Sequence, residues 1–312
     1  FYPPHTSRVG DHAFILDREL KRRGKNTGVI VYRDLPTGER EGVYQGGLKC
    51  KNLTDIIERE KPKVLLLHYV CYGFQDRGVP IFLPFVLSKV RKMYPKLRLW
   101  IFFHELNAFG AITSSAFWLS GLQLKICKDL YRLADQAFTN CDDFLNKIKR
   151  WKIHDRLDLC EVFSNLGEPD RLFEGRKGGV LLGAAQTKEK VFSNLGQNIH
   201  LLKSLGLNEL VDIGSKVNLP SELKGELSLN HQGILPEEEV SALLSKASYG
   251  ILCYEPGFLG KSGVYAAYLA HGCRVINLLS TPSMLHQNHL SSYLEYSDRN
   301  IISSLEKILS HF

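Results

Sequence analysis

Residues 255–263 form the part of this chain that is best suited to binding a phosphate group. They read EPGFLGKSG, follow an apolar run at residues 250–253, and precede residues 264–269, in which apolar side chains recur at helical spacing. The pattern predicts a buried strand, a turn and the start of a helix. A helix start presents free backbone N–H groups and a partial positive charge, to which Lys261 adds a full charge.

A P-loop for ATP or GTP is the first alternative for this turn. That motif has a glycine five residues before Gly-Lys-Ser, and this position holds Glu255. Gly257 supplies only G-x-x-G-K-S, which is too short to surround a β-phosphate. We therefore favour a site for the diphosphate of another ligand, and an ordinary tight turn with an exposed lysine remains the simpler alternative.

The overall composition is that of a soluble globular protein with one large or two smaller domains. The chain has 312 residues, of which 44% are hydrophobic and 23% charged. Seven cysteines without paired spacing favour a reducing compartment, so we expect a cytoplasmic protein without a structural zinc motif. Because the chain opens on Phe-Tyr-Pro-Pro without Met, we expect an apolar strand to precede it in the natural protein.

Charge is distributed unevenly between the two halves. Residues 1–165 hold 27 Lys and Arg against 18 Asp and Glu, a net charge of +9, whereas residues 166–312 hold 13 against 15, a net charge of −2. A basic first half could contact an anionic membrane surface or an anionic acceptor. The basic clusters at residues 21–23, 89–98 and 147–152 are explained equally well as solvated helix faces. No recognition-helix pattern accompanies the charge, so we expect no nucleic-acid partner.

Strands and helices alternate along both halves. Predicted helices cover residues 13–23, 53–60, 84–94, 114–134, 142–151, 198–205, 236–246 and 300–309; predicted strands cover residues 29–32, 63–71, 97–103, 136–139, 180–183, 209–214, 231–235 and 274–279. This alternation is typical of doubly wound α/β domains. We place one domain at residues 1–167 and the second at 168–312, with the last helix as a candidate to pack back on the first domain.

Four segments resemble the glycosyltransferases of the two-Rossmann (GT-B) fold, most closely the retaining family 4 (glycosyltransferase group 1) branch. They are YPPHTSRVGDHAFILDRELKRRG at the start, FFHELNAFG at residues 102–110, VLLG with Lys190 seven residues after Gly183, and residues 231–276. The resemblance implies two Rossmann-like domains facing across a cleft. The first domain would hold the acceptor and the second a nucleotide-diphospho-sugar donor.

The same resemblance implies a sugar transfer with retention, without metal and without a cofactor besides the donor. The chain contains no D-x-D motif, which agrees with a site free of metal. The acceptor would be a saccharide, a lipid or a small molecule, and the enzyme could be associated with a membrane surface.

The residues that match the family pattern fall into four groups. We assign catalytic roles to His104, Lys190 and Lys261. The donor diphosphate would be bound by Lys190, Gly260, Lys261, Ser262, Gly263 and Gly10. The nucleoside would meet Gly233, Ile234, Leu235 and Glu255, and the acceptor Arg8, Asp11 and Glu105. His68 is either a neighbour of His104 or a histidine of the core.

Three departures from the family pattern leave other functions open. Ala184 replaces the usual arginine of the phosphate segment. Of the family's two paired glutamates, the first would fall near Leu259, with Glu255 close by but displaced, and the second, which normally binds the donor ribose, falls on Ala267. A nucleotide-sugar epimerase of similar fold is one alternative. A degenerate protein that binds nucleotide sugars without turnover is the other.

Overall fold

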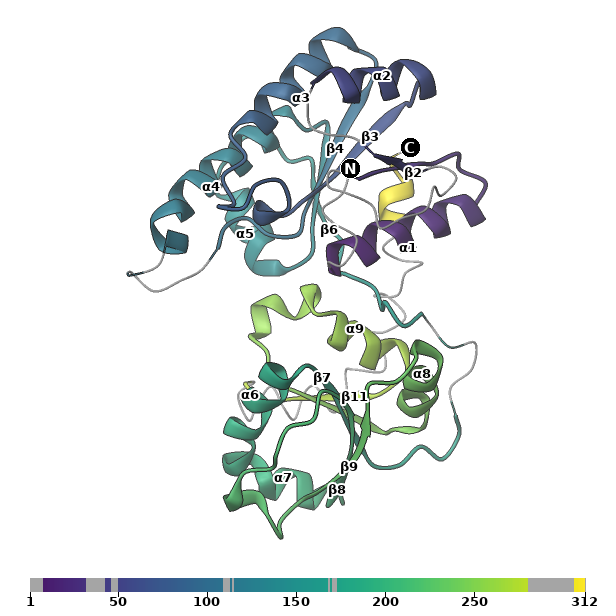
Figure 1. Cartoon of the computed structure of the whole chain (residues 1–312), viewed down its shortest axis with the longest axis vertical. Helices are drawn as coiled ribbons and strands as arrows, with labels where there is room; N and C mark the ends of the chain where they lie inside the picture. The colour runs from purple at the N-terminus through teal and green to yellow at the C-terminus, as the bar shows by residue number, and fades with distance from the viewer. Residues whose placement is uncertain are drawn as a thin grey trace. The chain divides into compact units, whose positions relative to one another are not determined.

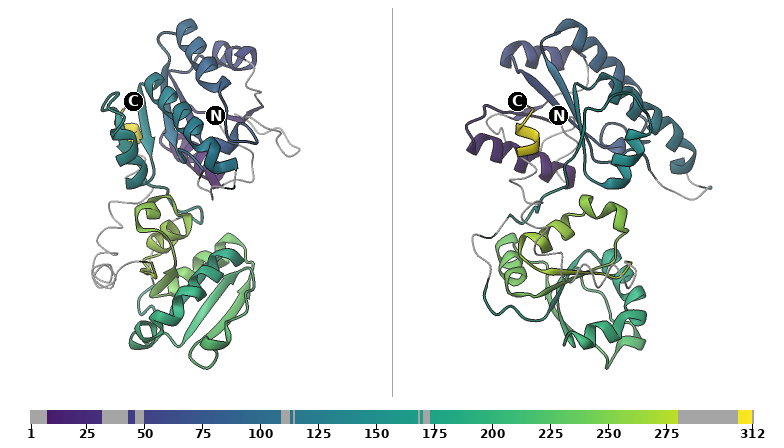
Figure 2. Two further views of the ribbon diagram at one scale, coloured as in Figure 1. Left: turned by 90° about the vertical axis from the view of Figure 1, so that its left-hand side faces the viewer. Right: turned by 180° about the vertical axis from the view of Figure 1, so that it is seen from behind.

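The computed structural model describes residues 8–31, 43–45, 50–108, 113, 115–167, 169, 173–279 and 306–311. The chain divides into two compact units, Phe1–Glu161 with Lys307–Phe312, and Val162–Glu306. The predicted boundary lay between residues 167 and 168. In each unit, helices flank a parallel sheet (Figures 1 and 2).

The first unit is built on a four-stranded parallel sheet. Its helices are α1 (Arg8–Arg22), α2 (Cys50–Glu60), α3 (Phe82–Met93), α4 (Ser115–Leu133) and α5 (Asp142–Lys149). Its strands are β1 (Val29–Val31), β2 (Val43–Gln45), β3 (Val64–Tyr69), β4 (Arg98–Phe103), β5 (Gln136–Thr139) and β6 (Leu157–Leu159). The sheet has the order β3-β4-β5-β6, and β1 pairs separately with β2.

Strand β4 lies at the centre of this unit. Its residues from Leu99 to Phe103 are all buried, as expected for an inner strand of a parallel sheet covered on both faces. The chain end packs on the same unit, because Arg98 donates a hydrogen bond to the carbonyl of His311 at 2.8 Å and the His311 ring lies 6.2 Å from that of Trp100.

The second unit contains a five-stranded parallel sheet. Its strands are β7 (Gly179–Gly183), β8 (Glu209–Gly214), β9 (Ser228–Gly233), β10 (Tyr249–Leu252) and β11 (Arg274–Asn277), in the order β11-β10-β7-β8-β9. Its α-helices are α6 (Ala185–Leu195), α7 (Ile199–Ser204), α8 (Glu237–Lys246) and α9 (Gly263–Ala270). Neighbouring residues of β7, Val180 and Leu181, belong to different hydrophobic clusters, so both faces of the sheet are covered. The predicted doubly wound α/β class is confirmed.

Helix α9 is fixed to this sheet by the hydroxyl group of Tyr268. Strands β7 and β10 pair over only two residues, Gly179 and Val180 of β7. Beyond them the Tyr268 hydroxyl accepts a hydrogen bond from the Leu182 N–H at 2.8 Å and lies 3.2 Å from the Ile251 carbonyl oxygen. The phenol thus replaces strand-to-strand hydrogen bonds where the ladder stops.

Gly250 leaves the space that the ring of Tyr268 occupies. A β-carbon at residue 250 would lie 2.4 Å from two carbon atoms of the Tyr268 ring. We expect Gly250→Ala to displace the ring and to lower the free energy of unfolding by ~1–3 kcal/mol through overpacking, measured by urea denaturation. Gly196→Ala is the control, because a β-carbon there would meet nothing within 4 Å. Equal stability of the two variants would contradict the expectation.

Several elements differ from the sequence-based expectation. Strands β2 and β6 and helix α6 were not predicted, and β9 begins three residues before the predicted strand at 231. Of the predicted helix at residues 300–309, residues 306–309 are helical and the rest lie outside the described residues. Among the described residues, no helix combines the length and the apolar character that crossing a bilayer requires.

Candidate functional site

The turn after β10 is held in place by Asn277, the last residue of the neighbouring strand β11. The Asn277 side chain accepts a hydrogen bond from the Tyr254 N–H at 2.9 Å and donates one to the Tyr254 carbonyl at 2.7 Å. A short 3-10 helix, η4 (Pro256–Lys261), follows and leads through Ser262 into α9. The predicted sequence of strand, turn and helix start is therefore present.

Ser262 caps the start of helix α9. Its buried hydroxyl accepts a hydrogen bond from the Tyr265 N–H at 3.2 Å, and its own N–H donates to the Leu259 carbonyl at 2.9 Å. The two remaining first-turn amides, those of Gly263 and Val264, precede the first intrahelical bonds and point out of the helix end. These amides can bind an anion. The hydroxyl of Ser262 already accepts the capping hydrogen bond of the helix.

Residues 162–165 run beside this helix start. The Val162 N–H donates to the carbonyl of Gly260 at 2.8 Å, and a β-carbon at Gly263 would lie 3.8 Å from the Asn165 side-chain oxygen. Gly260 is buried. The turn is thus supported from the sheet by Asn277 and from the preceding segment by Val162.

Two lysines lie at the carboxyl edge of the sheet near this turn. The Lys261 ammonium lies 5.6 Å from the ring centroid of Phe258, and its side chain is half-buried. Lys190 is exposed on α6, which follows β7, the neighbour of β10. Burial raises the pKa of the Cys253 thiol at the end of β10, and the positive charge of Lys190 opposes that shift. Lys190 therefore acts on the same loop region as Lys261 through its charge.

The predicted nucleoside residues occupy the same edge of the sheet but not one strand. Glu255 is exposed just after β10, and Gly233, with a φ of +78°, ends β9. Ile234 is 86% exposed, while Leu235 packs against the core. Strands β7 and β8 lie between β9 and β10. Glu255, after β10, and residues 233–235, at the end of β9, could therefore contact a common ligand only from different sides.

A buried ion pair that the sequence did not single out lies behind the turn after β7. Lys188 of α6 and Asp212 of β8 are 0% and 1% exposed, and the Lys188 ammonium lies against the Asp212 carboxylate. Lys188 also donates to the carbonyl of Ser215 at 2.7 Å, and the second Asp212 oxygen lies 2.7 Å from Nδ1 of His231. Lys188 thus faces the interior, and Lys190 faces solvent.

His104 lies directly after β4, as predicted, and its side chain is buried. Its Nε2 lies 3.0 Å from Nδ1 of His68, and the His12 ring of α1 lies 4.9 Å from the His104 ring between centroids. His68 is therefore the neighbour of His104. Burial lowers the pKa of His12 to about 3, and burial together with the charges of His104 and His12 lowers the pKa of His68. The catalytic role of His104 stays a prediction.

The other predicted residues of the first unit lie close in sequence to the histidines of this cluster. Gly10 is buried and Asp11 exposed in the first turns of α1, which begins at Arg8. Glu105 is half-buried, and one of its carboxylate oxygens lies 3.8 Å from the sulfur of Cys71. These positions do not decide whether the predicted acceptor residues share one surface. Their roles therefore stay predictions.

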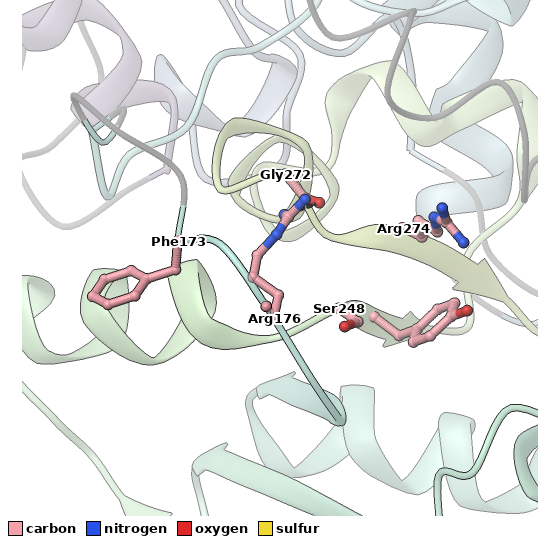
Figure 3. A pocket seen from close by; sticks show the side chains of 7 residues that line it. Phe173, Arg176, Ser248, Gly272 and Arg274 are labelled. Atoms are coloured by element: carbon pink, nitrogen blue, oxygen red, sulfur yellow. Dashed lines mark hydrogen bonds between the residues drawn. The ribbon is translucent and has the colours of Figure 1, made fainter.

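A cavity of about 510 Å³ lies at the opposite, amino edge of the second sheet (Figure 3). It is lined by Phe173, Gly175, Arg176, Ser248, Tyr249, Gly272 and Arg274. Arg176 donates to the carbonyl oxygens of His271 and Gly272. Its guanidinium therefore serves the end of helix α9, and none of the predicted site residues lines this cavity.

Comparison with solved structures identifies the fold. An α-glucosyltransferase bound to UDP and DNA containing an HMU base is 13% identical, with 93% of this chain and 86% of that chain covered and a TM-score of 0.51. UDP-GlcNAc 2-epimerase from Methanocaldococcus jannaschii is 11% identical, with 96% of this chain and 95% of that chain covered and a TM-score of 0.53. S. aureus MnaA with UDP is 12% identical, with 98% of this chain and 93% of that chain covered and a TM-score of 0.50.

These likenesses define the class: the chain is an α/β protein of the GT-B fold, with two Rossmann-like units. Glycosyltransferases and epimerases are both among the proteins that share this fold with it. Models of known protein families and curated protein sequences give no match. The family 4 branch therefore stays a prediction.

Proposed function

We propose that this protein is a glycosyltransferase that moves a sugar from a nucleotide-diphospho-sugar donor to an acceptor, with retention and without a metal at the diphosphate. The observation that carries the proposal is the turn between β10 and α9. There, the first-turn amides of a capped helix and the charge of Lys261 lie at the carboxyl edge of a parallel sheet. Ligands of open α/β sheets bind at this edge.

The reaction leaves a nucleoside diphosphate whose negative charge grows as the bond to the anomeric carbon breaks. Lys261 and the amides of Gly263 and Val264 would stabilise that charge directly. Lys190 would add a second cation from α6. Since Ala184 stands where the resembled family has an arginine, the proposal assigns the electrostatic stabilisation of the diphosphate to these groups.

A thermal-shift experiment tests the proposal. In EDTA, we expect one of UDP, GDP, ADP or CDP, or one of their sugars, to raise the melting temperature, because a ligand that binds only the folded protein stabilises it. The sugar nucleotide of the responding base then serves as donor against an acceptor pool. If none of these compounds shifts the melting temperature while ATP with Mg²⁺ does, the proposal is wrong and the P-loop alternative applies.

Epimerisation is the second candidate, supported by the fold shared with UDP-GlcNAc 2-epimerase over 95% of that chain. An epimerase would convert the donor sugar to its epimer with no acceptor present, whereas the proposed transferase would leave the donor sugar unchanged. NMR of the donor after incubation with the protein alone separates the two reactions. Tight binding without either reaction would indicate a nucleotide-sugar-binding protein.

The basic character of the first half supports an anionic acceptor or an acceptor at an anionic membrane surface. Residues 1–165 carry a net charge of +9. An anionic membrane surface attracts Lys and Arg clusters through the negative potential of its acidic lipids. The proposed partners are therefore a nucleotide sugar and a saccharide, lipid or small-molecule acceptor, in a cytoplasmic setting.

A further inference from the structure

Three histidines from three separate elements meet inside the first unit. His12 belongs to α1, His68 to β3, and His104 follows β4. Each is at most 4% exposed, and one ring nitrogen of each lies within 4.8 Å of those of the other two. Residues separated by 36 to 92 positions along the chain thus place three imidazole nitrogens around one point.

The spacing of the rings is suitable for three ligands of one ion. Their centroids are 4.9 Å, 5.3 Å and 5.5 Å apart, and Nδ1 of His68 lies 3.0 Å from Nε2 of His104. A tetrahedral zinc ion bound at ~2.0–2.1 Å separates its ligand nitrogens by about 3.3 Å. The two closest nitrogens would move slightly apart, and the ring of His12 would turn inward.

We propose that His12, His68 and His104 together bind one divalent transition-metal ion of the zinc type. Imidazole nitrogens suit Zn²⁺, Ni²⁺ and Cu²⁺, whereas Mg²⁺ and Ca²⁺ require oxygen ligands. The ion would join α1 to the carboxyl ends of β3 and β4. This site goes beyond the proposed transfer reaction, whose diphosphate groups lie in the second unit, and a His104 that binds the ion would not have the catalytic role predicted from the sequence.

The competing explanation is a metal-free core of packed rings. The His68–His104 hydrogen bond and the ring of Phe102, 4.9 Å from that of His12 and 4.3 Å from that of His104, would then account for the cluster by packing alone. The two explanations differ in the affinity of the folded protein for an added ion.

Zinc titration of the full chain, first stripped with chelator and then dialysed, decides between them. We expect one equivalent of Zn²⁺ by isothermal titration calorimetry, with a raised melting temperature. His12→Phe keeps the aromatic packing and removes one ligand. We expect this variant to lose more than the ~10–100-fold in affinity that the loss of an outer-shell partner costs.

Two controls make the result specific. His200→Phe alters an exposed histidine of α7 and is expected to leave zinc binding unchanged. His12→Asn tests the same ligand position with a smaller polar group, and circular dichroism of both metal-free variants checks that they fold. Zinc that fails to bind the unaltered chain, or that binds folded His12 variants equally well, would overturn the inference.

Discussion

Replacing Lys188 with methionine is expected to lower the free energy of unfolding by ~3–5 kcal/mol, because it leaves a buried carboxylate without its cation. Asp212 is 1% exposed, and Lys188 is fully buried. The side chain of His231 remains beside Asp212, but that ring is partly exposed and contacts the other oxygen of the carboxylate. Guanidinium denaturation at pH 7 measures the loss.

Lys190→Met is the matched control for this prediction. It removes the same charge from the same helix, two residues further along, at an exposed position. Surface substitutions of this kind change stability by about 0.5 kcal/mol or less. The double replacement Lys188→Met with Asp212→Leu should recover most of the loss, because the buried charge is gone as well. Similar stabilities of Lys188→Met and Lys190→Met would refute the importance of the buried pair.

Replacing Lys261 with alanine is expected to abolish the rise in melting temperature caused by the nucleoside diphosphate that binds the unaltered chain. The change removes one charge-assisted contact, which is worth ~1.5–3 kcal/mol. This corresponds to a loss of about 10-fold to 150-fold in affinity. Titration calorimetry of the same nucleotide gives the loss directly.

Lys224→Ala is the control for this second prediction. Lys224 is an exposed lysine of the same unit, and it lies before β9, at the amino edge of the sheet. Its replacement is expected to leave nucleotide affinity unchanged. An affinity for the nucleotide that stays the same in Lys261→Ala would show that the diphosphate binds elsewhere.

The parts of the fold that the sequence predicts best are the buried strands. Strands β5 and β8 have the predicted bounds, because each is a short, largely apolar run flanked by polar residues, Asp135 and Asn140 for β5 and Asn208 and Ser215 for β8. Strand β2 has only three residues and offers no such run. Helix α6 was missed because its N-cap residue, Ala184, makes no side-chain cap, so the usual signal of a helix start is lacking.

The weak sequence signal of α6 also hides the role of Lys188. On a helix, Lys188 shares one face with Val191, Phe192 and Leu195, all of them buried, whereas Lys190 is turned by about 200° from Lys188. Recognising that spacing would have placed Lys188 inside. Its partner, Asp212, was visible as the one charged residue within the apolar part of β8.

The histidine cluster could be predicted only in part. The pairing of His68 with Phe102 brings β3 and β4 into register, so both His68 and His104 reach the carboxyl edge of the sheet. Sequence patterns place these two strands side by side. The position of His12 depends on how α1 packs on that edge, through tertiary contacts of α1 with β1 and the ring of Phe102.

The hydroxyl of Tyr268 has a consequence for any ligand at the start of α9. Because this side chain locks the helix to β7 and β10, the conformational entropy of the helix is lost during folding rather than during ligand binding. A ligand then meets amides that are already oriented, and its affinity is not reduced by ordering them. Preorganisation of this kind would let a short, eight-residue helix present its first-turn amides to an anion without a further cost of ordering.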